Sequence, residues 1–211
     1  MAENLLPRII CFGDSNTYGA HGFTGGRYSR QERWTGLLTD DPLFSGKYEF
    51  INMGENGRAI PSGDFEPDYE CRQIAKNGPA ALLIIMLGTN DLLSGARGLT
   101  NAVSKMDGFL QSLLAFEPAE SLIGGDASRL LLLAPVRTDL ARYGAQGARF
   151  DDLSGRLGGE YCRLAERLGA HFADAGSWGV QTGQDGVHFT EKGHKTFAGW
   201  LKLELAEILG L

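Results

Sequence analysis

The stretch CFGDSNTYG, at residues 11–19, leads from a short apolar run into a Gly-Asp-Ser turn that carries Ser15. A serine hydroxyl becomes a nucleophile when a neighbouring base removes its proton, and histidine is the most common base. We assign that role to His188, because Asp185 precedes it on a predicted turn and can hold one imidazole nitrogen while the other faces Ser15. Ser15, Asp185 and His188 are therefore the predicted catalytic residues of an acyl-transfer reaction.

Acyl transfer also needs hydrogen-bond donors at the point where the carbonyl oxygen becomes negatively charged. The side chain of Asn90, in the stretch GTND, offers an amide N–H, and the backbones of Ser15 and Gly57 offer further N–H groups. A glycine at such a place lets the substrate approach the backbone closely. We predict an oxyanion hole made by Ser15, Gly57 and Asn90, with Gly54 of the same loop as a competitor to Gly57.

The elements that must position these residues are visible as short apolar runs. Most of the runs lack strict alternation of apolar and polar residues, which is typical of parallel strands covered on both faces. Apolar residues at helical spacing lie between the runs. The predicted strands are residues 8–12, 48–52, 81–87, 129–134 and 170–174. The predicted helices are residues 34–38, 67–77, 100–116, 153–168 and 197–208.

Strands that alternate with helices predict a single α/β domain over residues 1–211. We expect a three-layer α/β/α sandwich with a central five-stranded parallel sheet, flavodoxin-like and doubly wound with right-handed crossovers. The carboxyl ends of parallel strands share one edge, where open α/β sheets bind ligands. The Gly-Asp-Ser turn and the oxyanion donors follow the first three strands, and the loop with His188 follows the fifth. Two long irregular stretches, residues 19–30 and 135–149, are expected to be functional or disordered loops.

Composition and charge argue against several classes of protein. The chain has 211 residues, of which 43% are hydrophobic and 22% charged, as in soluble globular proteins. A net charge of −6 and a pI near 5.2 argue against nucleic acid or an anionic membrane as a partner. No apolar run approaches the roughly 18 residues of a membrane span, and no secretory signal is evident, so we expect a cytoplasmic protein. The three cysteines fit neither a disulfide framework nor a metal site.

Other catalytic interpretations fit the spacing less well. Ser177, in AGSWG, matches a variant of the nucleophile elbow, but Asp185 and His188 follow it too closely for an α/β-hydrolase. His188, Glu191 and His194 have neither of the zinc-binding spacings H-E-x-x-H and H-x-x-E-H. A two-metal phosphoesterase would need further Asp and His ligands at strand ends. We therefore expect neither a metal nor a cofactor.

Several side chains near the predicted site are candidates for substrate contact. Aromatic side chains can line a pocket for an acyl or aryl group, and each of these is equally compatible with the hydrophobic core. Asp14 is expected to brace the nucleophile turn by hydrogen bonding. The candidates are Asp14, Tyr18, Trp34, Trp178 and Phe189.

The motifs together resemble those of the SGNH, or GDSL-type, hydrolases over nearly the full chain. FGDSNTYG resembles the family's first block, which carries the nucleophile, here Ser15. INMGENGRA resembles the second block, whose oxyanion glycine falls on Gly57, and LGTND resembles the third, whose asparagine is Asn90. DGVHFTEKGH resembles the last block, with Asp185 and His188. RWTGLL and LIIMLGTNDL are similar to the arylesterase and carbohydrate acetylesterase branch.

The resemblance implies a serine esterase that hydrolyses short acyl, acetyl-type esters of small-molecule or carbohydrate alcohols through an acyl-enzyme. Acyl transfer to alcohols as a side activity and homo-oligomer formation also occur in that branch. The alternatives are a thioesterase or lysophospholipase of the same fold, and an SGNH-fold binding protein without activity. Asn16 departs from the family pattern, which has leucine after the serine, and VRTDLARYGAQ departs from the Pro-rich loop expected there. From the sequence we expect both departures to affect the choice of substrate and not the mechanism.

Overall fold

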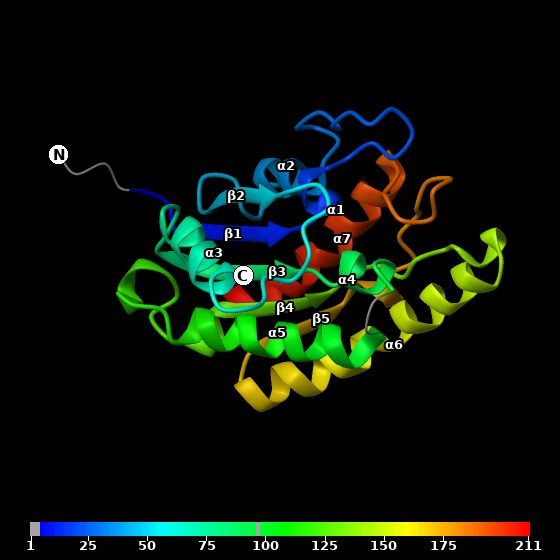
Figure 1. Cartoon of the computed structure of the whole chain (residues 1–211). Helices are drawn as coiled ribbons and strands as arrows, with labels where there is room; N and C mark the ends of the chain where they lie inside the picture. Colours follow the sequence, from blue (N-terminus) through cyan, green and yellow to red (C-terminus); the bar gives the residue numbers. More distant parts are fainter. Residues whose placement is uncertain (1–4, 96–97) are drawn as a thin grey trace.

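A central parallel sheet organises the molecule (Figure 1). The computed structural model describes residues 5–95 and 98–211, so residues 1–4 of the N-terminal segment and residues 96 and 97 lie outside the description. The sheet has five strands in the order β2-β1-β3-β4-β5, and each neighbouring pair is parallel. The strands are β1 Arg8–Gly13, β2 Glu49–Gly54, β3 Ala80–Met86, β4 Leu130–Ala134 and β5 His171–Asp174.

Helices cover both faces of this sheet. Helices α3, α5 and α6 pack on one face and α2 and α7 on the other, while α1 and α4 follow the carboxyl ends of β1 and β3 (Figure 1). The predicted α/β/α sandwich is thus confirmed. Within the described residues, no helix combines the length and apolarity needed to cross a membrane. The helices are α1 Ser15–Tyr18, α2 Trp34–Asp40, α3 Glu66–Ala75, α4 Thr89–Leu93, α5 Gly98–Leu114, α6 Ala145–Leu168 and α7 Glu191–Leu209.

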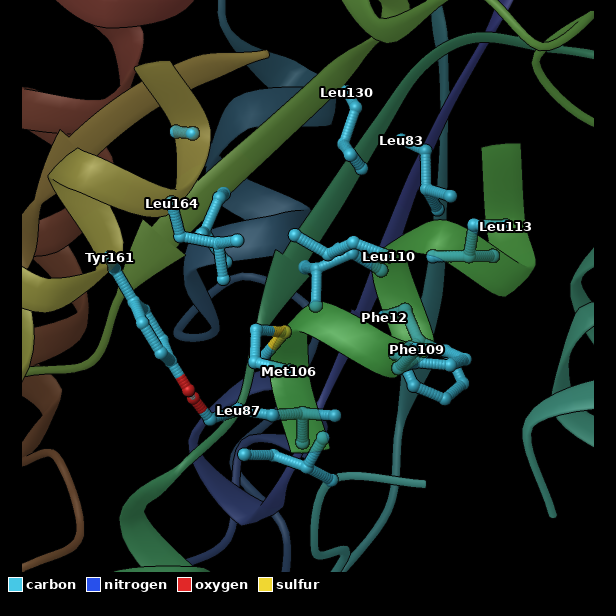
Figure 2. Close-up of a cluster of buried hydrophobic side chains, with 14 of the residues drawn as sticks. Phe12, Leu83, Leu87, Met106, Phe109, Leu110, Leu113, Leu130, Tyr161 and Leu164 are labelled. Carbon is cyan, nitrogen blue, oxygen red and sulfur yellow. Dashed lines mark hydrogen bonds between the residues drawn. The ribbon is translucent and has the colours of Figure 1, made fainter. Parts of the chain in front are cut away.

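Alternate residues of each strand enter two separate hydrophobic cores. Ile10 and Phe12 of β1 belong to the core beneath α5 and α6, whereas Ile9 belongs to the core beneath α2 and α7. Figure 2 shows the first core, in which Tyr161 reaches from α6 to the end of β3 and donates a hydrogen bond to the carbonyl of Leu87 at 3.1 Å. Because both faces of the strands are buried, neither face needs to be polar, which explains the continuous apolar runs.

The carboxyl ends of the first three strands lie level with one another. Gly13, the last residue of β1, pairs with Gly54 of β2 and with Met86 of β3. The chain leaves β1 towards β2 on one side of the sheet and continues with β3 on the other side. This order places a topological switch point at β1 and β3, where a sheet of this type forms its ligand crevice. The polar segments that follow these strands therefore meet at one place.

The structure corrects the prediction that residues 135–149 form one irregular stretch. A 3-10 turn covers Ala141–Tyr143, and α6 begins at Ala145. The glycines in GAQGARF conceal the helix start, because glycine is a poor helix former. Gly147 is nonetheless required, since a Cβ there would lie 1.9 Å from the carbonyl oxygen of Leu140.

Candidate active site

Ser15 is the first residue of the short helix α1, directly after β1. Asp14 caps this helix, and its Oδ1 accepts a hydrogen bond from the N–H of Asn16 at 2.9 Å. Gly13 is required before the turn, because a Cβ there would lie 2.1 Å from Oγ1 of Thr17. The first N–H groups of a helix have no acceptor within the helix, so the Ser15 N–H is suited to bind a substrate oxygen.

His188 lies on the turn between β5 and α7. Its Nδ1 is 2.7 Å from Oδ2 of Asp185, whose Oδ1 accepts hydrogen bonds from the N–H groups of Val187 and His188, both at 3.0 Å. Burial alone would raise the pKa of Asp185, but these hydrogen bonds outweigh it and hold that pKa below its usual value. The ionised carboxylate keeps the ring proton on Nδ1 and leaves Nε2 to act as a base.

The side chain of Asn16 connects the nucleophile turn to the histidine turn. Its Nδ2 donates to the carbonyl of Val187 at 3.1 Å, and its Oδ1 accepts from the N–H of Phe189 at 3.0 Å. These two residues flank His188. Asn16 is only 5% exposed, so both hydrogen bonds are shielded from water. The residue that departs from the GDSL pattern thus holds the backbone on both sides of the predicted base.

The predicted oxyanion residues follow β2 and β3. Nδ2 of Asn90 donates to the carbonyl of Arg58 at 2.9 Å, and because an amide nitrogen carries two hydrogens, one remains for a substrate oxygen. Gly57 has a φ of +76°, and a Cβ built on it would meet no atom within 4 Å. Gly54 instead packs against α1, where a Cβ would lie 2.0 Å from the backbone nitrogen of Tyr18. Gly57 is therefore the glycine with open space above it.

One cavity of about 410 Å³ brings the predicted catalytic and oxyanion residues together. Its volume lies in the range of small-molecule sites. Within the described residues no hydrogen bond joins Ser15 to His188, and such bonds commonly form only when substrate binds. The predicted residues that line this cavity are Ser15, Gly57, Asn90, Asp185 and His188.

The aromatic candidates lie outside this cavity. Trp34 is 1% exposed and Trp178 is 8% exposed, and both belong to the core beneath α7. The guanidinium of Arg27 lies over the ring of Tyr18, 4.2 Å from its centroid. Phe189 lines a neighbouring hollow that also contains His188. The cavity around Ser15 is accordingly formed mainly by small and polar residues.

Asp14 lies behind the nucleophile turn. It is only 2% exposed, and burial raises its pKa to about 6, although the Asn16 N–H and the nearby side chains of His188 and Arg58 favour its charged form. Its side chain does not belong to the lining of the cavity described above. The carboxyl therefore braces α1, as expected from the sequence.

Two further residues of this region were not among the predicted site residues. His21 lines the cavity from the loop after α1. Arg58 donates to the carbonyls of Gly13 and Met53, at the ends of β1 and β2, and forms an ion pair with Glu55 at 2.8 Å. The only sequence signal for His21 is its place in a long loop after a strand, whereas Arg58 belongs to the INMGENGRA block that also carries Gly57.

The residues of the alternative interpretations serve other purposes. Oγ of Ser177 donates to the carbonyl of Asp174 at 2.7 Å and stabilises a turn. His194 is fully buried, and its ring packs edge-on against Tyr28 and Phe189. In the described part of the chain, no group of three or more His, Cys, Asp or Glu side chains is arranged to hold a metal ion.

A parallel sheet of this order, with a serine, a histidine–aspartate pair and amide donors at its carboxyl edge, is the arrangement of an acyl hydrolase. The model of the GDSL-like lipase/acylhydrolase family matches residues 11–196. The chain belongs to this family and is an enzyme that acts on ester bonds, which confirms the family predicted from the motifs. Comparison with curated protein sequences gave no match.

Solved structures of similar fold agree with this assignment. A protein described as an arylesterase from Agrobacterium tumefaciens str. C58 is 30% identical, with a TM-score of 0.82 over 96% of this chain and 100% of that one. The M. smegmatis aryl esterase is 25% identical, with a TM-score of 0.79 over 96% of this chain and 99% of that one. A carbohydrate acetylesterase family member from Sinorhizobium meliloti, 24% identical, shares the fold with a TM-score of 0.82 over 98% and 100% of the two chains.

Proposed function

We propose that the protein is a serine esterase that hydrolyses short-chain, acetyl-type esters of small-molecule or carbohydrate alcohols through an acyl-enzyme. One observation carries this proposal: a nucleophile candidate, a histidine–aspartate pair and amide donors line a single cavity of about 410 Å³. The similar structures described as an arylesterase and an aryl esterase support an ester substrate.

Acylation begins when Nε2 of His188 takes the hydroxyl proton of Ser15 while Oγ attacks the ester carbonyl. The carboxylate of Asp185 stabilises the imidazolium that forms. The carbonyl oxygen becomes an oxyanion and accepts hydrogen bonds from the N–H groups of Ser15 and Gly57 and from the amide of Asn90. The bond to the alcohol oxygen then breaks, and His188 returns the proton to that oxygen.

Deacylation uses the same groups. A water molecule gives a proton to Nε2 of His188 and attacks the acyl group on Ser15. The tetrahedral oxyanion forms again in the same place, and the acid leaves as the proton returns to Oγ. When an alcohol replaces the water, the product is a new ester, so these residues also support acyl transfer as a side activity.

The proposal is tested with p-nitrophenyl acetate, butyrate and octanoate. The wild-type protein should show its highest kcat/KM with the acetate, and a fluorophosphonate should label Ser15. Ser15→Ala should remove the labelling and lower kcat by at least about 10⁴-fold, with the circular dichroism spectrum unchanged. Retained turnover in Ser15→Ala contradicts the assigned nucleophile, and an optimum at octanoate contradicts a short acyl group.

A further inference from the structure

A second hollow of about 280 Å³ adjoins the cavity around Ser15. The two share His21, Gly22, Asp185 and His188. Among the described residues that line the second hollow there is no nucleophile or oxyanion donor of the proposed mechanism. The second hollow therefore borders the reaction centre at the histidine–aspartate pair and at the loop that carries His21.

The proposed chemistry assigns different parts of an ester to the two hollows. The carbonyl oxygen must lie among the oxyanion donors, which belong to the larger cavity. The alcohol oxygen must lie beside His188, because that residue returns the proton when the alcohol leaves. The rest of the alcohol then extends beyond His188, and the hollow that contains this residue without the oxyanion donors is the space into which it would extend.

The loop that carries His21 lines both hollows and packs against the predicted base and its carboxylate. A Cβ at Gly22 would lie 2.1 Å from Oδ2 of Asp185 and 3.1 Å from Cβ of His188, so only glycine allows this close approach. The loop is closed by two backbone hydrogen bonds between His21 and residues 25 and 26, at 2.9 and 2.8 Å. These two bonds close the loop on itself beside the histidine–aspartate pair.

The two ring nitrogens of His21 differ in their hydrogen bonding. Its Nδ1 accepts hydrogen bonds from the N–H groups of Phe23 and Thr24, at 3.3 and 3.2 Å, and the ring stacks on Tyr28 with centroids 4.7 Å apart. A neutral imidazole whose Nδ1 is an acceptor carries its proton on Nε2. Within the described residues, no protein group accepts a hydrogen bond from this Nε2–H. His21 therefore offers a donor to a ligand in the hollows that it lines.

We propose that the 280 Å³ hollow binds the alcohol part of the ester and that Nε2–H of His21 donates to a hydroxyl group of that alcohol. Tyr28 lines the hollow beside His21, whose ring stacks on it, and Nε2–H of His21 adds a polar donor, a combination that suits a hydroxylated alcohol. His21 is then a specificity-determining residue for hydroxylated alcohols. This inference rests on the proposed esterase function.

The test compares two acetates with different alcohols, p-nitrophenyl acetate and 6-O-acetylglucose, in two matched variants. In His21→Asn, the amide oxygen replaces Nδ1 as acceptor for Phe23 and Thr24, as in an Asx turn, but the distal donor is lost. In His21→Gln, an amide N–H takes the place of Nε2–H. Thermal denaturation of both variants verifies that they are folded.

We expect His21→Asn to lower kcat/KM for 6-O-acetylglucose by about fivefold to tenfold more than it lowers the value for p-nitrophenyl acetate, mainly through KM. His21→Gln should retain more of the activity on 6-O-acetylglucose than His21→Asn. Equal losses on both acetates would show that His21 only orders the loop, and an unchanged ratio in His21→Asn would show that it does not contact the alcohol. Either result overturns the inference.

Inhibition of the wild-type protein provides a measurement that needs no variant. Glucose should inhibit hydrolysis of p-nitrophenyl acetate competitively and more strongly than cyclohexanemethanol, which has a similar ring without the ring hydroxyls. Stronger inhibition by cyclohexanemethanol overturns the inference and leaves the esterase proposal standing. A wild-type protein that hydrolyses neither acetate overturns the esterase proposal and the alcohol site with it.

Discussion

The side-chain amide of Asn16 holds the backbone on both sides of His188. The two hydrogen bonds, to the carbonyl of Val187 at 3.1 Å and from the N–H of Phe189 at 3.0 Å, use both ends of the amide. Because Asn16 directly follows Ser15, this one side chain links the position of the nucleophile to that of the base. A leucine, which the GDSL pattern has here, can form neither hydrogen bond.

We predict that Asn16→Leu lowers kcat for p-nitrophenyl acetate by about 10-fold to 100-fold, because a shift of the base by a fraction of an ångström misaligns proton transfer. The change in KM should be smaller. The variant also leaves a shielded carbonyl and N–H unpaired, so its melting temperature should fall. Kinetics measured well below that temperature separate the two effects, and a wild-type kcat would show that Asn16 stabilises the fold without positioning His188.

The proposed oxyanion hole predicts a larger effect on kcat for Asn90→Ala, with little change in KM. An oxyanion donor acts mainly in the transition state, so kcat should fall by about 10²-fold to 10³-fold while KM changes little. Labelling by a fluorophosphonate should slow in parallel, because that reaction also develops charge on an oxygen. The hydrogen bond from Asn90 to the carbonyl of Arg58 provides the competing explanation. A fall in kcat of less than about threefold, accompanied by a lower melting temperature, would favour that structural role.

The fold and the composition of the cavity could be predicted because their signals are local. Continuous apolar strands indicate a parallel sheet, and the carboxyl ends of such strands meet at one edge. Ser15 and Asn90 each follow a strand directly, so strand order alone brings them close together. Spacing alone could not show that Asp185 and His188 act together with these two residues. The resemblance of the motifs to the family blocks supplied that assignment.

The surroundings of the cavity could not be predicted, because tertiary packing decides them. An aromatic residue near a motif suits a pocket and a core equally, and only the path of α7 across the sheet buries Trp34 and Trp178. His21 belongs to a long loop with four glycines nearby, which by itself indicates only irregular structure. Its place beside Asp185 depends on the close approach at Gly22, a contact between segments far apart in sequence.

The buried carboxyl of Asp14 predicts a pH dependence of stability. Its pKa of about 6 in the folded protein lies above its usual value of 3.8, so between about pH 4 and pH 6 the folded state holds the proton that the unfolded state has lost. This group therefore makes the protein less stable as the pH rises through that window, by up to about 3 kcal/mol. Asp14→Asn, which retains the helix cap, should remove this fall. Urea denaturation of the wild type and the variant at pH 4 and pH 7 measures the fall in the free energy of unfolding. An equal fall in both proteins would show that Asp14 does not cause it.

His194 predicts the opposite pH dependence of stability over a similar range of pH. It is fully buried, neither ring nitrogen has a partner among the described residues, and burial lowers its pKa to about 4 from a usual value of 6.5. As the pH falls from about 6.5 to 4, the unfolded state takes up a proton that the folded state does not. This group therefore makes the protein less stable with falling pH, by up to about 3 kcal/mol.

His194→Phe keeps an aromatic ring against Tyr28 and Phe189 and removes the titrating group. We expect the free energy of unfolding of this variant to exceed that of the wild type by more at pH 4.5 than at pH 7.5, because only the wild type carries the cost of a buried neutral histidine in acid. Urea denaturation at both values measures the two differences. A difference that does not change with pH would show that repacking of the ring, and not protonation of His194, determines the effect of the substitution.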